Sequence, residues 1–418
     1  MDRVQGNEKI NQLLMPLPAD QDHHFKVTPM CLRHEERHSG SHRNGGVVIV
    51  FMVLMAMTFL APGMFMVWAG QPTIPAPNSK DPGETGIVQR METNSGEQSS
   101  PYADAPEPKW GSPTVLESCW SPEELAGSAA DKRIIGTGAA PPRACQGRTF
   151  LHNIGKPLPA ELRSSIRSVK PDGNRKLIAL TFDLCESANE ISGYDAEIVN
   201  YLRRNQVKAT FFAGGKWMCS HPEKTMQLMA DPLFEIGNHS WTHPNFRRLD
   251  RQGIAEQVLR TQAQYQLLRE ELTARPCARR CPPEELSKIP KAPLTFRFPY
   301  GACNKEALDF LASSGLPAIQ WSVVTGDPAP GQTAGVISRE ILEKTRPGAI
   351  IICHANGRGH GTAGALPLFI PKLIQSGYEF VTISELLASG SAIAVGECYA
   401  ARPGDNIHDD RLWRFGKE

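Results

Sequence analysis

The sequence predicts an α/β protein built around a parallel β-sheet, and three observations support this fold class. From about residue 170 onward, short apolar runs with the length of strands alternate with stretches that have helical spacing. The number of alternations matches a barrel of seven or eight strand–helix units. Residues 174–390 are also numerous enough to bury the core of such a barrel.

The expected strands are short runs dominated by apolar side chains. They lie at residues 176–183, 209–213, 234–238, 294–298, 318–324, 349–354 and 379–382. Between them, apolar residues recur at the spacing of amphipathic helices. The expected helices cover residues 194–205, 222–230, 250–272, 305–312, 335–344 and 367–376. Residues 273–293, which contain proline and cysteine, indicate an inserted loop.

Ahead of this domain lies an apolar segment, residues 47–68, that carries no charge. It is long enough to cross a bilayer core of about 30 Å as a helix. Arg33, Arg37 and Arg43 lie shortly before it, and the next basic residue after it is Lys80. This asymmetry orients the N-terminus inward and the rest of the chain outward. We therefore expect an exported protein, either anchored in the inner membrane and facing the periplasm or secreted after cleavage of a signal segment.

Changes in amino-acid composition divide the rest of the chain into segments. The first residues are polar and lack periodicity, and the stretch after the apolar segment is dense in Pro, Gly and Ser, as in linkers that bury no core. Two apolar pieces within that stretch, around Val115–Trp120 and Arg133–Ile135, could dock onto the following domain. The expected division is a disordered cytoplasmic tail (1–44), a transmembrane anchor or signal (45–70), a linker (71–142), a lead-in segment (143–173), the α/β domain (174–390) and a C-terminal tail (391–418).

Charge and cysteine content narrow the possible partners and compartment. The formal net charge is +1, so no global field points to nucleic acid. Nine of the ten cysteines follow the apolar segment, where an exported chain would meet conditions that permit disulfides. Cys277 and Cys281 are close enough in sequence to close a small loop.

A pair of histidines follows the expected strand at 234–238. His239 and His243 are four residues apart, so their imidazoles can share one metal ion. Pro244 biases His243 away from a helix, which predicts a short turn. Two partly buried structural histidines are the alternative.

Reactive side chains fall at or just past the C-terminal ends of several expected strands. They are Asp183, His239, Arg297, Asp327 and His354. In a β/α barrel these strand ends share one rim, so residues far apart in sequence converge on one mouth.

These residues lie in five motifs that occur in order: Thr181–Asp183 (TFD), His239–His243 (HSWTH), Arg297–Gly301 (RFPYG), Trp321–Asp327 and Ile350–His354. In this respect the chain resembles the polysaccharide deacetylases with a NodB-homology domain, also called carbohydrate esterase family 4, over residues 174–388. The resemblance implies a distorted barrel that removes the N-acetyl group from an amino-sugar polymer such as peptidoglycan or a chitin-like glycan. It also implies one divalent metal, commonly zinc, held by two imidazoles and a carboxylate with a position left for water.

The resemblance assigns a role to each residue. Asp183 is the general base and His354 the acid that protonates the leaving amine. Arg297 holds Asp183, and Asp327 orients His354. The backbone N–H of Tyr300, together with the metal, stabilises the oxyanion.

Aromatic residues in these motifs could also contact the substrate. Tyr300, Trp241 and Trp321 are possible faces for stacking against sugars. Burial in the core is an equally good interpretation of each.

One motif departs from the family pattern. Family members read T-F-D-D-G, with the second Asp as third metal ligand, whereas this chain has Leu184, Cys185 and Glu186 after Asp183. Leu184 cannot bind metal. We expect Glu186 to be the third ligand, followed in rank by Asp183 and then by a Cys185 thiolate; if Asp183 binds the metal, Glu186 could be the base.

Two other functions fit the same residues. One is a hydrolase that removes a formyl group, or an ester-linked acetyl group, from another glycan. The other is a carbohydrate-binding module with a degenerate centre, against which the retained acid and base argue.

Overall fold

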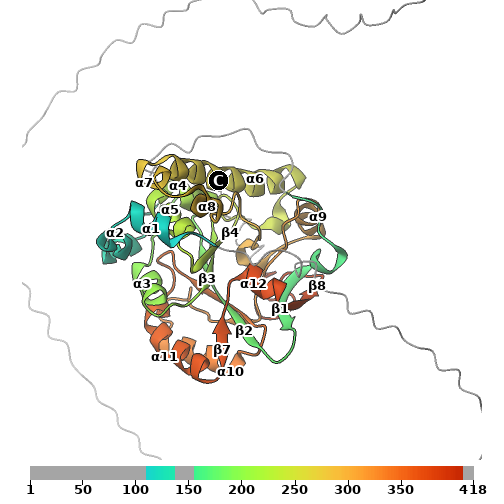
Figure 1. Cartoon of the computed structure of the whole chain (residues 1–418). Helices are drawn as coiled ribbons and strands as arrows, with labels where there is room; N and C mark the ends of the chain where they lie inside the picture. The colour runs from blue at the N-terminus through green and yellow to red at the C-terminus, as the bar shows by residue number, and fades with distance from the viewer. Residues whose placement is uncertain (1–109, 137–154, 408–418) are drawn as a thin grey trace, which may run out of the picture. The chain divides into compact units, whose positions relative to one another are not determined.

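A parallel sheet lies at the centre of the computed structural model of the chain, which describes residues 110–136 and 155–407 (Figure 1). The strands are β1 (Ser165–Pro171), β2 (Lys176–Leu184), β3 (Ala209–Ala213), β4 (Phe234–Asn238), β5 (Val323–Val324), β6 (Ile350–His354), β7 (Tyr378–Phe380) and β8 (Gly390–Val395). Within the central sheet the order is β4-β3-β2-β6-β5, with β7 paired to the N-terminal part of β2, and all pairs are parallel. The parallel sheet expected from the sequence is confirmed.

The register of this sheet aligns the C-terminal ends of its strands. Asp183 of β2 lies beside Phe212 of β3 and beside His354 of β6. Ala213 of β3 lies beside Asn238, the last residue of β4. Loops that leave these strands therefore start at one edge, which is where parallel α/β proteins place their chemistry.

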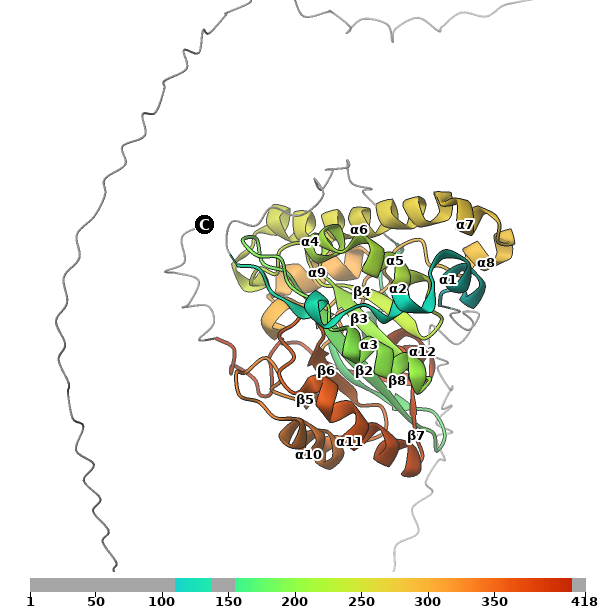
Figure 2. The same cartoon turned by 90° about the vertical axis from the view of Figure 1, so that its left-hand side faces the viewer.

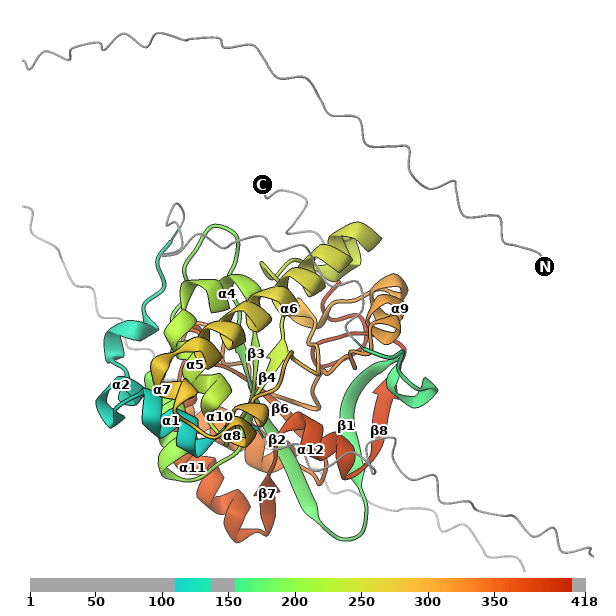
Figure 3. The same ribbon diagram turned by 45° about the horizontal axis from the view of Figure 1, so that its top comes forward.

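Helices cover the central sheet on two sides. The α-helices of the described residues are α1 (Pro113–Cys119), α2 (Pro122–Ala126), α3 (Ala196–Arg204), α4 (Gly215–Ser220), α5 (Pro222–Ala230), α6 (Arg251–Ala274), α7 (Pro276–Arg279), α8 (Pro283–Ser287), α9 (Lys305–Ser313), α10 (Ala334–Lys344), α11 (Thr362–Gln375) and α12 (Ile383–Ala388). Figures 2 and 3 show the long helix α6 with α4 and α5 on one side of the sheet, and α10 with α11 on the opposite side. Each expected helix is present, although α11 begins at Thr362, ahead of the expected start.

Aromatic side chains of neighbouring strands fill the core beneath the helices. Phe182 stacks on Phe211 with ring centroids 5.3 Å apart, and Phe211 meets Phe234 edge to face at 5.1 Å. These three residues, on β2, β3 and β4, are almost fully buried. The strands read as nearly continuous apolar runs because helices cover both faces of the sheet.

Two expected strands are much reduced. Phe296 makes only isolated parallel bridges, to Asn238 on one side and to Ala318 on the other. The expected strand at 318–324 is a ladder only at Val323–Val324. Closure into a barrel of seven or eight units stays a prediction.

The expected linker contributes to the folded domain. Val115, Leu116 and Trp120 are buried in its largest apolar cluster, so the docking expected for Val115–Trp120 is confirmed. A disulfide between Cys119 and Cys277 joins α1 to α7.

The inserted segment also differs from its expectation. Residues 273–293 contain the short helices α7 and α8. Cys281 is a buried free thiol, so the small loop expected between Cys277 and Cys281 is wrong. The partner of Cys277 lies 158 residues away in the sequence, a separation that spacing alone does not reveal.

The segments before and after the central sheet form a second, antiparallel sheet. Strand β1, in the expected lead-in segment, pairs with β8 from Ser165–Val395 to Pro171–Gly390. After β8, a disulfide joins Cys398 to Cys303.

Within the described ranges 110–136 and 155–407, no helix is both long and apolar enough to cross a membrane. The apolar segment at 47–68 lies outside these ranges, so its role as an anchor or signal stays a prediction.

Candidate functional site

The candidate site forms at the aligned strand ends, where the structure brings together most of the residues singled out from the sequence. Asp183 forms an ion pair with Arg297, with Oδ1 and Nη1 2.8 Å apart. Its other oxygen, Oδ2, lies 3.5 Å from Nε2 of His239. His354 is its neighbour in the β2–β6 register.

The two histidines occupy a tight turn after β4. Ser240 and His243 adopt left-handed backbone conformations, with φ of 66° and 61°, which cost about 1–3 kcal/mol each in residues other than glycine. The Ser240 amide donates to the Asn238 side chain, and the His243 amide donates to the Ser240 hydroxyl. This turn brings the two imidazoles to a centroid distance of 5.0 Å.

Both imidazoles are kept in the neutral form that can bind a metal. Nδ1 of His239 donates to the carbonyl oxygen of Arg297 at 2.9 Å, which leaves a lone pair on Nε2. Nε2 is buried and has no hydrogen-bond partner among the described residues. Burial lowers the pKa of His239, and burial together with His239 holds the pKa of His243 well below its usual range.

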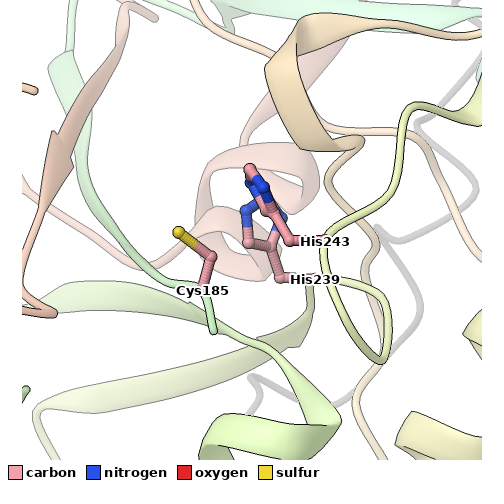
Figure 4. A group of neighbouring side chains, drawn as sticks. All are labelled: Cys185, His239 and His243. Atoms are coloured by element: carbon pink, nitrogen blue, oxygen red, sulfur yellow. The ribbon is translucent and has the colours of Figure 1, made fainter. Parts of the chain in front are cut away.

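Cys185 completes a group that fits a metal ion. Its Sγ and one ring nitrogen each of His239 and His243 all lie within 4.8 Å of one another (Figure 4). Burial, with the Asp183 carboxylate nearby, raises the pKa of the thiol to about 12, so the sulfur keeps its proton until a cation displaces it. One sulfur and two nitrogens are donors typical of zinc sites, and the unpartnered Nε2 of His239 is consistent with such a site.

The structure does not bring Glu186, the ligand ranked first from the sequence, to the histidines. Its Oε1 accepts hydrogen bonds from Lys216 at 2.9 Å and Ser220 at 2.6 Å, and its Oε2 accepts one from the Ser192 amide. These partners hold the Glu186 carboxylate, while the sulfur of Cys185 is the atom grouped with the two histidines. The geometry favours Cys185 over Glu186 as a ligand.

The buried ion pair between Asp183 and Arg297 fixes the carboxylate. Nη1 of Arg297 donates to both Asp183 and Thr181 at 2.8 Å, and the guanidinium lies over the Phe212 ring at 4.0 Å. Burial alone would raise the pKa of Asp183, but His239, Arg297 and His354 together lower it. Asp183 is therefore ionised at neutral pH and able to accept a proton.

Asp327 orients His354 through hydrogen bonds that engage both oxygens of the Asp327 carboxylate. Its Oδ1 lies 2.9 Å from Nδ1 of His354, and its Oδ2 accepts the His354 amide at 2.7 Å. Thr325 and Thr362 donate to the same carboxylate. Burial would lower the pKa of His354, but Asp327 outweighs it and the pKa is raised. The imidazolium is thus stabilised, as an acid requires.

Of the three aromatic residues, only Tyr300 is substantially exposed, at 36 %. Its ring meets His243 edge to face at 4.4 Å, and its φ of 58° places it in a turn of left-handed conformation. Trp241 is buried beneath Arg260, and Trp321 is buried with its indole donating to the Ala400 carbonyl. The core interpretation holds for both tryptophans.

Sequence reasoning missed two polar residues that meet the end of β2. Lys216 binds Glu186, and the Asn356 side chain donates to both the carbonyl oxygen and the sulfur of Cys185. Asn356 stands two residues after His354, so its place in the loop after a strand was the available signal.

Several known proteins are similar in sequence to this chain. Residues 170–282 match the family model described as polysaccharide deacetylase. The chain is 33 % identical over 224 residues to the peptidoglycan-N-acetylglucosamine deacetylase PgdA of Listeria monocytogenes, covering 54 % of this chain and 41 % of that relative. It is 30 % identical over 224 residues to a chitooligosaccharide deacetylase of Bradyrhizobium sp., covering 50 % of this chain and 90 % of the relative. A solved structure of a carbohydrate esterase family 4 pseudoenzyme from Bacillus anthracis is 26 % identical, with a TM-score of 0.43, and the match covers 54 % of this chain and 69 % of that one.

The chain belongs to the polysaccharide deacetylase family. It spans less than half the length of the Listeria relative.

Proposed function

We propose that this protein is a metal-dependent hydrolase that removes the acetyl group from an N-acetylated amino-sugar glycan, such as peptidoglycan or a chitin-like polymer. One observation carries the proposal: a carboxylate and an imidazole, each fixed by an ion pair, lie at the same edge of the sheet as two neutral histidines that can bind a metal. Asp183 is fixed by Arg297, and His354 by Asp327. The names of the relatives that act on peptidoglycan and chitooligosaccharides support this substrate class.

The metal would be one divalent cation, with zinc as the expected ion, held by Cys185, His239 and His243. When bound, it would act as a Lewis acid and lower the pKa of a water molecule toward neutrality. The proximity of the three donor atoms supports this ligand set over the one containing Glu186, whose oxygens already accept hydrogen bonds from three groups.

Asp183 would be the general base. Its lowered pKa keeps it ionised, and Arg297 leaves Oδ2 on the side of the histidines. Asp183 would take the proton of the attacking water as that water adds to the amide carbonyl carbon.

His354 would protonate the leaving amine as the carbon–nitrogen bond breaks. Asp327 occupies its Nδ1, so Nε2 is the nitrogen able to deliver the proton. The backbone N–H of Tyr300 would donate to the carbonyl oxygen as negative charge develops there. The contact between Tyr300 and His243 supports a position beside the metal ligands.

We also infer that the protein works outside the inner membrane, anchored through residues 47–68 or released after cleavage. The disulfides Cys119–Cys277 and Cys303–Cys398 support an oxidising compartment.

The purified full chain, supplied with zinc, is incubated with chitooligosaccharide or peptidoglycan, and released acetate and formate are measured. We expect acetate, and its loss in Asp183→Asn. Formate in place of acetate would indicate a deformylase, and no product from any glycan while zinc is bound would favour a binding module.

A separate measurement tests the ligand set through zinc affinity by competition with a chelator. Cys185→Ala should bind zinc much more weakly, whereas Glu186→Gln should retain most of the affinity. The reverse order would restore Glu186 as ligand and remove Cys185.

A further inference from the structure

Asn356, in the loop that follows β6, contacts the proposed sulfur ligand directly. It is fully buried, and its side-chain nitrogen Nδ2 lies 2.7 Å from the carbonyl oxygen of Cys185 and 3.1 Å from its Sγ. An amide NH₂ group has two hydrogens, so it can serve both acceptors at once. Asn356 therefore holds the backbone and the side chain of the same residue.

The orientation of the Asn356 amide is determined by its neighbours. Its Oδ1 accepts the backbone N–H of Arg358 at 3.3 Å. If the amide were flipped, Oδ1 would face the carbonyl oxygen of Cys185, which can only accept. The N–H groups must therefore point toward Cys185.

Backbone hydrogen bonds fix the loop that carries Asn356. The Ala355 amide donates to the Asp183 carbonyl at 3.2 Å, and the Ala355 carbonyl accepts from the Asp195 amide at 2.7 Å. The Asn356 carbonyl accepts from the Gly193 amide at 2.9 Å. Asn356 is thus held between the end of β2 and the loop that leads into α3, and it cannot retreat from Cys185 without breaking these bonds.

We propose that Asn356 is a positioning residue that aims the Cys185 sulfur at the two histidines and donates an N–H···S hydrogen bond to it. The inference rests on the proposed metal centre. A cysteine presents a single donor atom that can rotate about the Cα–Cβ bond into three staggered positions. The Asn356 contact selects one of them, and its N–H dipole stabilises negative charge on a sulfur that lies close to the Asp183 carboxylate.

A purely structural role is the competing explanation, because the bond to the Cys185 carbonyl would also stabilise the loop. The two roles differ in what they change. Loss of a loop contact lowers the melting temperature without changing the charge on the sulfur. Loss of the bond to sulfur also changes the electronic character of the metal–thiolate bond, which a spectrum reports.

The test substitutes Co²⁺ for zinc in the full chain and records the thiolate-to-cobalt charge-transfer absorption, alongside zinc affinity measured by chelator competition. The variants are Asn356→Ala and Asn356→Ser. Asn200→Ala, which removes an exposed side-chain hydrogen bond to the Ala126 carbonyl, away from Cys185, is the control. Cys185→Ala identifies the sulfur band.

We expect the charge-transfer band to shift in both Asn356 variants and zinc affinity to fall about 10- to 100-fold, with no change in Asn200→Ala. Asn356→Ser keeps a small polar side chain, so this variant is used for the measurement if Asn356→Ala does not fold. An unshifted band with undiminished affinity would overturn the role of Asn356 and leave the metal centre intact. A wild-type protein without a Cys185-dependent band would overturn the metal centre, and this inference with it.

Discussion

A buried carboxyl group on β4, outside the proposed set of metal ligands, makes stability depend on pH. Glu235, near the start of β4, is fully buried and accepts hydrogen bonds from the amide and the hydroxyl of Ser384 and from Thr210. Burial nevertheless raises its pKa to about 7 from the usual 4.5. The folded protein therefore binds a proton at Glu235 over a range in which the unfolded chain has released it.

The sign and size of the effect follow from this difference. Between pH 4.5 and about 7 the folded state holds the proton more tightly, so the free energy of unfolding falls as the pH rises. At about 1.4 kcal/mol per pKa unit, the full loss is about 3 kcal/mol and is complete above pH 7. Glu235→Gln mimics the protonated form, because its amide can accept from the Ser384 N–H and donate to the Ser384 hydroxyl.

The assay is urea denaturation of the wild type and Glu235→Gln under non-reducing conditions, at about pH 4.5 and about pH 8.5. The first pH lies at the lower edge of the range over which stability changes, and the second lies above it. We expect similar stabilities at the lower pH and a variant more stable by about 3 kcal/mol at the higher pH. Glu379→Gln, which alters an exposed carboxylate paired with Arg175, is the control and should follow the wild type. Equal stability of Glu235→Gln and wild type at both pH values would refute the reasoning.

Two further predictions concern the site and the segment beside it. Asp327→Asn removes the charge that raises the pKa of His354, so the alkaline limb of the kcat/KM profile should move to lower pH, and an unmoved limb would contradict the role of His354 as acid. Cys398→Ser opens the disulfide to Cys303, which spans 95 residues, and should lower the free energy of unfolding by about 4–5 kcal/mol. An unchanged urea midpoint would show that this disulfide contributes nothing to stability.

The sequence predicted the parallel sheet because its strands are nearly continuous apolar runs between amphipathic helices. Reactive residues at strand ends could be assigned to one edge because the C-terminal ends of parallel strands lie together. The pairings of Asp183 with Arg297 and of His354 with Asp327 agree with that assignment. The pairing of Phe296 could not be predicted from the sequence. Residues 294–298 have the composition of a strand, but the tertiary structure limits the pairing of Phe296 to isolated bridges.

The order of the candidate ligands could not be settled from the sequence. Leu184 belongs to the apolar core, but β2 ends at Leu184, so the alternation of side chains along the strand does not decide where Cys185 and Glu186 point. The extra reach of a glutamate side chain favours Glu186, whereas the structure gives its carboxylate other partners. The partners that hold Glu186 could not be predicted, because Lys216 lies in a short helix without a clear periodic pattern.

A Cys–His–His donor set would change which metals the site prefers, relative to a family pattern that supplies a carboxylate. A carboxylate is a hard oxygen ligand, suited also to magnesium, calcium and manganese, whereas a thiolate is soft and favours zinc and similar ions. Charging the Cys185 sulfur is unfavourable because the sulfur is buried and the Asp183 carboxylate lies close to it. The hydrogen bond from Asn356 and the metal itself both offset that cost, so we expect ion selectivity and the contact to Asn356 to depend on each other.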